Sequence, residues 1–350
     1  MTLPIELSFE PMELVQVEAI PAGDQWQYEP KWDGFRCMSF RDGDDVHLQS
    51  KAGQPLARYF PEIVAALRAL GPKQCVLDGE LMLQLGEELS FDALLQRIHP
   101  AESRVKRLAM ETPARYVVFD LLVDERGRDL TGEPLERRRS ALERFAKRNF
   151  ATGTIALSPV TSDLAAVNAW YERVGNALDG VVAKRRDLPY ASGTREGGVK
   201  IKHLRTADCV VGGYRLNKER NGIGSLLLGL YDDDGKLNHV GFTSGFQARE
   251  RGPLLERVRA VEKPPGFTGT KPGGPSRWKQ TEEPWFPLAP KLVVEVRYDH
   301  VTGDRFRHGT KIMRWRPDKK PRQCTMDQLR VAEAASPLDL LPSQAGSTFG

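Results

Sequence analysis

One lysine in this sequence lies in a setting that suits covalent chemistry. The stretch 29-EPKWDGFR-36 places Lys31 two residues before an Asp-Gly pair and just ahead of a strand-like run. Asp-Gly is typical of a tight turn, and glycine lets a ligand approach the backbone closely. A lysine amine is a nucleophile only when unprotonated, and with a pKa of ~10.4 only about 0.1% of it is neutral near pH 7.4. By itself the stretch is explained as well by an exposed lysine in a turn.

Six further short motifs follow in order along the chain. They are 50-SKAG-53, 78-DGE-80, 119-FDLL-122, 179-DGVVAK-184, 200-KIK-202 and 316-RPDK-319. Each alone has an ordinary explanation, as a turn, a strand end, a core aromatic or a solvated charge. Chance is a poor explanation of the whole set in this order and spacing.

Together these motifs resemble those of the covalent nucleotidyltransferases, the superfamily of DNA ligases, RNA ligases and mRNA capping enzymes. The resemblance covers residues 29 to 319. Within the superfamily the chain looks most like the small stand-alone bacterial ATP-dependent ligases of the ligase C class, on the strings 179-DGVVAKRRDLPYASGTR-195 and 305-RFRHGTKIMRWRPDK-319. It implies an enzyme that uses ATP and Mg²⁺ or Mn²⁺ to seal nicks between a 3′-hydroxyl and a 5′-phosphate, through a lysyl-AMP and a DNA-adenylate.

The resemblance also implies roles for individual residues. Lys31 becomes adenylated, and Lys184, Lys200 and Lys202 reach the phosphates. The residues expected around the adenosine are Glu29, Arg36, Glu80, Phe119 and Val182, with Phe119 stacked on the base. Glu80 and Asp179 are the expected metal ligands, because carboxylate oxygens suit Mg²⁺. Lys200 and Lys202 are two residues apart, so in a strand they share a face, and as cations they would help to lower the pKa of Lys31.

Two positions depart from the family pattern, and one segment lies far from the rest. Asp179 stands where glutamate is usual, which shortens the carboxylate by one methylene. Lys51, counted with the nucleotide-binding residues, stands where arginine is common and offers a point charge in place of a bidentate fork. The resemblance implies that Arg316, Asp318 and Lys319 close over ATP and orient the departing pyrophosphate.

The elements that must position these residues change character near residue 200. Before it, strand-like runs at 36–40, 75–83, 116–122 and 180–184 alternate with helix-like stretches at 61–70, 135–148 and 163–174, which predicts an α+β domain. After it, short strands at 209–216, 225–232, 237–244 and 292–299 and one helix at 248–261 predict an OB-fold β-barrel. The expected domains are 1–204 (adenylation, nucleotidyltransferase), 205–330 (OB-fold) and 331–350 (a flexible C-terminal tail). Residues 263–290, rich in Pro and Gly, predict a long surface loop.

Composition bounds the class of protein. The 350 residues carry a formal net charge of +4 and are 40% hydrophobic, which excludes fibrous and wholly disordered chains. No apolar run is long enough to span a bilayer, and the four separated cysteines argue against a zinc site or a disulfide framework. Residues 1–200 hold 26 Lys and Arg against 30 Asp and Glu, whereas residues 201–330 hold 25 against 15, so the second domain is the one suited to a polyanion.

These observations lead to expectations about partners and location. Nicked or gapped duplex DNA is the expected substrate, with a separate repair polymerase as a further partner in DNA repair such as base excision repair. We expect a monomer in the bacterial cytoplasm, on the nucleoid when bound to DNA, with no membrane association. The alternatives are an RNA ligase or capping-type transferase, and a non-enzymatic OB protein that binds nucleic acid beside an inactive transferase domain.

Overall fold

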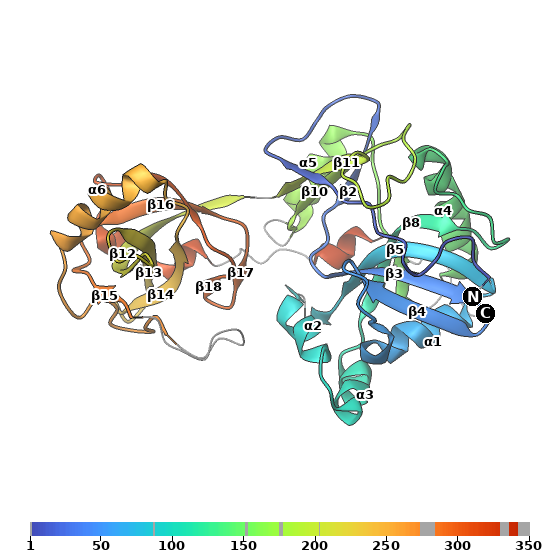
Figure 1. Cartoon of the computed structure of the whole chain (residues 1–350), viewed down its shortest axis with the longest axis horizontal. Coiled ribbons are helices and arrows are strands. Elements are labelled where there is room, and N and C mark those ends of the chain that lie inside the picture. The colour runs from blue at the N-terminus through green and yellow to red at the C-terminus, as the bar shows by residue number, and fades with distance from the viewer. Residues whose placement is uncertain are drawn as a thin grey trace. The chain divides into compact units, whose positions relative to one another are not determined.

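The computed structural model describes residues 2–86, 88–150, 153–174, 178–202, 204–273, 284–329 and 336–341. The chain forms two compact units, and Figure 1 shows the elements of each. Unit 1 consists of Met1–His203 with Ala332–Gly350, and unit 2 of Leu204–Val331. None of the helices in the described ranges has both the length and the apolar character needed to span a bilayer.

The larger sheet of unit 1 has the strand order β4-β3-β5-β8-β9. Its strands are β3 (Phe35–Asp42), β4 (Asp45–Ser50), β5 (Gln74–Met82), β8 (Arg115–Val123) and β9 (Ile155–Leu157), of which only β9 runs parallel to its neighbour. Most residues of β5 and β8 are buried, because both faces of these central strands are covered. A small hairpin, β6 (Gln84–Leu85) and β7 (Glu88–Leu89), follows β5.

Helices cover one face of this sheet. They are α1 (Pro61–Ala69), α2 (Phe91–Arg97), α3 (Glu102–Glu111) and α4 (Leu135–Asn149), with the short turn η1 (Ala57–Tyr59) before α1. In α4 the side chains of Leu135, Leu142 and Phe145 are buried, and the helix packs on β8 and β9. Their spacing of seven and three residues places them on one side of the helix.

The second sheet of unit 1 carries most of the lysine motifs. Its order is β1-β11-β10-β2, formed by β1 (Val15–Val17), β2 (Trp26–Pro30), β10 (Gly180–Arg185) and β11 (Gly198–Lys202). Helix α5 (Leu164–Val174) packs on β2, and Val167 lies in the apolar cluster with Val181 and Ile201. This sheet and the larger one supply the two sides of the cavity described below.

Unit 2 is the small barrel that the strand pattern predicts. Its strands are β12 (Arg205–Leu216), β13 (Ile223–Tyr231), β14 (Leu237–Thr243), β15 (Phe286–Pro287), β16 (Val293–Tyr298), β17 (Val301–Thr302), β18 (Arg305–Phe306) and β19 (Lys311–Trp315), with α6 (Ala248–Arg259), η3 (Pro321–Gln323) and η4 (Met326–Gln328). The order β14-β13-β12-β16-β19 is closed by a bridge between Thr243 and Thr310, where the Thr310 N–H donates to the Phe242 carbonyl at 2.9 Å. A closed five-stranded barrel with a helix between its third and fourth strands is an OB-fold.

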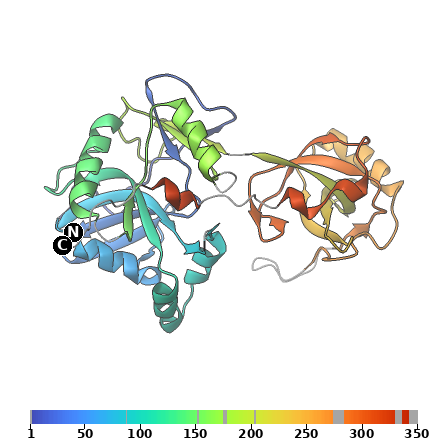
Figure 2. The same ribbon diagram turned by 180° about the vertical axis from the view of Figure 1, so that it is seen from behind.

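Two sequence expectations need correction. The segment 263–290 is not simply a surface loop, because Phe267 is fully buried and Trp285 packs on it at 5.6 Å between ring centroids; residues 274–283, with the central part of this loop, lie outside the described residues. The end of the chain is not wholly a free tail either, because η5 (Pro337–Leu340) buries Leu338 and Leu340 against Trp32 and other apolar residues of unit 1 (Figure 2, red). Burial of the apolar side chains of Pro337, Leu338 and Leu340 stabilises the packing of η5 on unit 1.

A stability prediction follows from the buried ion pair between α4 and β8. Arg138 and Asp120 are each 1% exposed and their charged atoms are 2.9 Å apart. Arg138→Ala leaves the Asp120 carboxylate buried without its partner, so we expect a loss of about 3 to 5 kcal/mol in the free energy of unfolding. Arg137→Ala, one residue away but 72% exposed, is the matched control and should change it by less than about 0.5 kcal/mol. Equal effects in chemical denaturation would contradict the assignment.

Candidate active site

A cavity of about 260 Å³ in unit 1 gathers most of the predicted site residues. Its lining comes from both sheets and from the segments beside them: Met12, Glu13, Leu14, Glu29, Pro30, Lys31, Trp32, Arg36, Lys51, Glu80, Phe119, Val182, Lys184 and Lys200. Nine of the predicted residues are therefore brought together. Asp179 and Lys202 are not in the lining, and Arg316, Asp318 and Lys319 belong to unit 2.

Backbone packing at two Asp-Gly pairs fixes the position of Lys31. A Cβ atom on Gly34 would lie 2.1 Å from the Leu81 carbonyl oxygen, and one on Gly180 would lie 2.0 Å from the Ile201 carbonyl oxygen. Only glycine permits such approaches. The missing side chain at Gly34 thus makes room for the neighbouring strand, and the approach of a ligand to this backbone stays a prediction. The Lys31 N–H donates to the Gly180 carbonyl at 2.9 Å, so the two corners hold the lysine between the sheets.

The Lys31 amine lies among carboxylates. It forms an ion pair and hydrogen bond with Asp179. Burial lowers the pKa of Lys31, but the Asp179 charge and hydrogen bond, with smaller effects of Glu80 and Asp33, more than offset it, so the net pKa is raised. The Asp179 contact therefore favours the protonated amine. This differs from the expectation that neighbouring cations lower its pKa.

The pKa of Glu80 is raised as well, in its case by burial. Burial raises its pKa to about 8, although Lys31 and Arg36 act to lower it. A carboxyl group in this state gains a large part of its charge only when more positive charge arrives nearby. Positive charge beside Glu80 would therefore favour its charged form.

Part of the cavity lining is a buried ion pair. Lys184 on β10 donates to Glu29 on β2 at 2.9 Å, and both side chains are at most 5% exposed. Gln27 donates to the other carboxylate oxygen of Glu29, also at 2.9 Å. The ammonium of Lys184 lies 4.4 Å from the ring centroid of Phe119, which also lines the cavity. Phe119 is thus a half-buried aromatic wall and not only a core residue, and Val182 lines the same cavity.

Arg36 reaches the cavity but its guanidinium is already engaged. It donates to both oxygens of Asp78, at 3.1 and 2.6 Å, and to the Met12 carbonyl at 2.7 Å. Tyr190 donates to Asp78 at 2.6 Å and accepts from the Met12 N–H at 2.9 Å. The network fixes the segment that begins at Met12 as one wall of the cavity. Asp78 buries its carboxylate completely, so its pairing with Arg36 is a structural requirement.

Of the remaining predicted lysines, Lys51 and Lys200 line the cavity and Lys202 does not. Lys51 follows β4, is half exposed, and pairs with Glu13 at 2.8 Å. Lys200 on β11 has a lowered pKa, first because of burial and then because of the nearby charges of Lys31 and Lys51. Lys202 lies two residues further along the same strand, opposite Gly180. These cations suit an anionic ligand beside Lys31.

The carboxylates near Lys31 suit a divalent metal that is also held by substrate phosphates and water. Among the described residues no group of three or more His, Cys, Asp or Glu side chains could enclose a metal ion. Mg²⁺ is usually held by one or two carboxylates together with substrate phosphates and water. Glu80 and Asp179, both acting on the Lys31 amine, fit that pattern.

The three predicted residues of unit 2 form a cluster around Asp208. Arg316 donates to Asp208 at 2.9 Å and to Asp318 at 2.8 Å, and Lys319 donates to Asp208 at 2.7 Å. The hydrogen bond from Arg316 lowers the pKa of Asp318 to about 2. Asp318 itself is 63% exposed, so it is presented to solvent while Asp208 anchors its two basic neighbours.

Sequence reasoning missed several residues that organise the site. Asp78 and Tyr190 lie inside the quoted strings DGE and DLPYASGTR, so a signal for them was present. Glu13, which pairs with Lys51 and Arg195, and Asp208 lie outside every motif. Only the folded chain brings their partners to them.

Two protein-family models match the chain, one in each unit. The family model described as "ATP dependent DNA ligase domain" matches residues 12–202, and "ATP dependent DNA ligase C terminal region" matches residues 219–319. The first match contains every lining residue of the cavity, and the second contains the Arg316 cluster except Asp208.

Two relatives and one solved structure illustrate the likeness. The chain is 44% identical to DNA ligase C of Mycobacterium tuberculosis, over 98% of this chain and 99% of the relative, and 45% identical to DNA ligase C2 of Mycolicibacterium smegmatis, over 94% and 96%. A structure from a study of Lig E DNA ligases is 18% identical, covers 88% of this chain and 99% of its own, and has a TM-score of 0.54, which supports the fold alone. The chain therefore belongs to the family of ATP-dependent DNA ligases, and its full-length likeness to the mycobacterial proteins places it in the ligase C class.

Proposed function

We propose that this protein seals nicks in duplex DNA with ATP, and that Lys31 is the residue that becomes adenylated. The observation that supports this most directly is the position of Lys31, at a cavity shared by Glu29, Phe119, Lys184 and Lys200. A cavity with one aromatic wall, one buried ion pair and several cations suits a purine at one end and phosphates at the other.

The reaction consists of three phosphoryl transfers. First, the Lys31 amine attacks the α-phosphorus of ATP, a P–N bond forms, the bond to the bridging oxygen breaks, and pyrophosphate leaves while the amine loses its proton. Second, the 5′-phosphate at the nick attacks the same phosphorus, and Lys31 leaves and regains a proton. Third, the 3′-hydroxyl attacks the 5′-phosphorus, a phosphodiester forms and AMP leaves. Positioning and charge neutralisation carry most of such catalysis.

The first transfer requires a change at the Lys31 amine. Its ion pair with Asp179 stabilises the protonated form, so the reactive form needs Asp179 to take up another partner. Glu80 and Asp179 are the residues that would hold a divalent ion, which would supply positive charge beside the phosphates. Lys200, whose pKa is already lowered, stays close to the amine and disfavours its protonation.

The other lining residues are proposed to bind the nucleotide. Phe119 and Val182 enclose the base, and the paired Glu29 and Lys184 stand at its edge. Glu80 contacts the ribose region. Arg36 positions the cavity wall at Met12 by donating to the Met12 carbonyl. The phosphates are assigned to Lys51, Lys200 and Lys202, and to Lys184, which pairs with Glu29.

Unit 2 is proposed to act in the first transfer and in DNA binding. Arg316, Asp318 and Lys319 orient the pyrophosphate as it departs, with Asp208 holding the two cations in place. Exposed basic residues such as Lys311, on β19, offer contacts to the phosphate backbone of DNA.

The cellular setting is proposed from the family and from the resemblance. We place the protein in the bacterial cytoplasm as a monomer, acting on nicked or gapped duplex DNA during repair. A separate repair polymerase is the partner that would fill a gap before sealing.

The identity of the nucleophile is tested by labelling. Lys31→Ala removes the attacking amine, so protein incubated with α-labelled ATP and Mg²⁺ and then denatured should carry no label above background. The control Lys106→Ala removes an exposed lysine on α3 and should label like the wild type. Label that persists on Lys31→Ala refutes the assignment. Selectivity for GTP, or transfer of the label to RNA ends only, would favour a capping enzyme or an RNA ligase.

The role of Asp318 is tested by separating the steps. Asp318→Ala should reduce labelling with ATP by on the order of 10²-fold, as expected for loss of one transition-state contact, yet retain sealing of a nick that is already adenylated. Asp234→Ala, also an exposed partner of a basic residue in unit 2, should affect neither step. An equal loss of both steps in Asp318→Ala would contradict a role confined to the first.

Salt dependence tests the DNA contacts. If about six phosphates are engaged, affinity for nicked duplex should fall about 10³-fold between 50 and 200 mM salt, and Lys311→Ala should reduce the slope by about one. Lys106→Ala on α3 should leave the slope unchanged. A flat salt response of the wild type would exclude backbone contacts as the main source of affinity.

A further inference from the structure

The C-terminal turn η5 completes an apolar cluster that reaches the cavity around Lys31, which we call the nucleotide cavity. The chain returns to unit 1 for this turn only after Leu204–Val331, which make up unit 2. In η5 the side chains of Pro337, Leu338 and Leu340 are buried, and the turn packs on α5 (Figures 1 and 2, red). A late segment of the sequence is therefore built into the first unit.

Two members of this cluster are the sequence neighbours of the residues that form the Lys31 ion pair. Trp32 follows Lys31 in the chain, and it also lines the nucleotide cavity. Leu178 directly precedes Asp179, the partner of Lys31. Trp32 and Leu178 are buried in one apolar cluster with the two leucines of η5. The side chains that share a cluster with η5 therefore belong to residues adjacent to both partners of the ion pair.

The Trp32 indole is held by one hydrogen bond and by apolar packing. Its Nε1–H donates to the Ser158 hydroxyl at 3.0 Å, and Ser158 is fully buried. An indole has this one donor and no acceptor, so packing must fix the rest of the ring. The buried members of the cluster are Trp32, Met82, Val117, Val174, Leu178, Leu338 and Leu340. The η5 leucines thus contribute a substantial share of the packing around the indole.

Loss of the two η5 leucines would leave a void in this cluster. Close-packed interiors transmit strain, and the residues around a void relax into it only in part. A shift of Trp32 or Leu178 would pass to Lys31 or Asp179, because each is one peptide bond away. A misplacement of about 1 Å that starts far from the chemistry can slow an enzyme about 10²-fold. The alignment of the Lys31 amine is therefore sensitive to the docking of η5.

We propose that Leu338 and Leu340 are positioning residues for adenylation, and that the Lys31 amine is aligned for attack only while η5 is docked. The inference rests on the proposed function, in which Lys31 is the adenylated residue. It adds a role for a segment that follows unit 2 in the sequence and lines no part of the nucleotide cavity. The docked turn acts through Trp32 and Leu178, not by touching the nucleotide.

The rate of self-adenylation of the full-length protein tests the proposal. Bound AMP is first removed with pyrophosphate and Mg²⁺, and uptake of label from α-labelled ATP is then followed at several ATP concentrations. Leu338→Ala combined with Leu340→Ala should lower the rate at saturating ATP by on the order of 10-fold to 10²-fold. The ATP concentration for half-maximal rate should change less than about twofold, because every lining residue of the nucleotide cavity is kept.

Leu338→Met combined with Leu340→Met is the conservative variant. Leucine and methionine have similar volume and apolar character, so the packing against Trp32 is largely retained. This variant should recover the wild-type rate to within about threefold.

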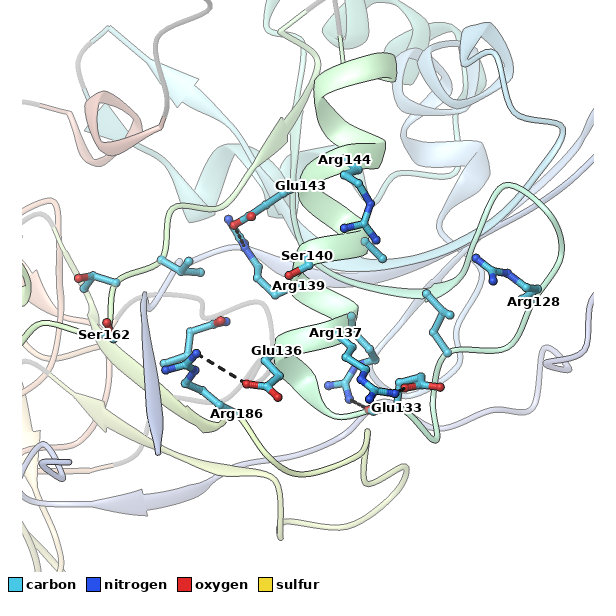
Figure 3. A pocket seen from close by; sticks show the side chains of 16 residues that line it. Arg128, Glu133, Glu136, Arg137, Arg139, Ser140, Glu143, Arg144, Ser162 and Arg186 are labelled. Atoms are coloured by element: carbon cyan, nitrogen blue, oxygen red, sulfur yellow. Dashed lines mark hydrogen bonds and ion pairs between the residues drawn. The ribbon is translucent and has the colours of Figure 1, made fainter. Parts of the chain in front are cut away.

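Leu142→Ala is the matched control for loss of stability. Leu142 is fully buried on α4, in a different apolar cluster of unit 1. Helix α4 borders a separate cavity of about 900 Å³, which shares no lining residue with the nucleotide cavity (Figure 3). Removing the Leu142 side chain weakens the fold. At a temperature where all variants are folded, its rate at saturating ATP should stay within about twofold of the wild type.

A second measurement needs neither ATP nor activity. Acetic anhydride modifies free amines, and mass spectrometry gives the acetylation rate of Lys31 relative to that of exposed Lys106. In the double alanine variant this ratio should rise about tenfold, as expected for loss of one hydrogen bond between charged groups. Leu142→Ala should leave the ratio unchanged.

Three results would overturn the proposal. These are a wild-type rate and acetylation ratio in the double alanine variant, an equal loss of rate in Leu142→Ala, and no recovery in the double methionine variant. Absence of label on the wild-type protein would instead refute Lys31 as the nucleophile. The acetylation ratio would then decide by itself whether η5 positions the Lys31 amine, so the two failures are distinguishable.

Discussion

Burial of charge between two β-sheets is the constraint on which the rest of unit 1 depends. The nucleotide cavity needs charged side chains, yet a charge removed from water is costly unless it is paired. The chain meets this by pairing across elements: Glu29 with Lys184, Arg36 with Asp78, and Lys31 with Asp179. Each pair joins segments far apart in sequence, so the interactions that tune the site also fix the two sheets around it.

The same pairing sets the protonation of the groups around Lys31. Asp179 stabilises the protonated Lys31 amine, and burial raises the pKa of Glu80 to about 8. Under the mechanism proposed above, both effects would reverse when a cation and the phosphates of ATP enter, and the Lys31 amine would lose its proton only then.

In unit 2 the core is apolar and the charged residues lie outside it. Its barrel closes through the Thr243 to Thr310 bridge, and its core is apolar. The charged residues that matter lie on its outside, where Asp208 holds Arg316 and Lys319 and leaves Asp318 exposed. The barrel therefore carries a small polar cluster together with the basic excess seen in the sequence of residues 201–330.

The sequence by itself determined the chemistry and the outline of the fold. Local patterns are sufficient for that, because the strands and helices with strong periodicity and the glycine corners at 34 and 180 are encoded in a few neighbouring residues. Tertiary structure alone decided the partners: that Asp179 raises the pKa of Lys31, that Arg36 is held by Asp78 and Tyr190, and that Leu338 and Leu340 return to Trp32. Pairing and burial depend on residues that are distant in sequence. A local sequence pattern does not predict how close such residues come in the folded chain.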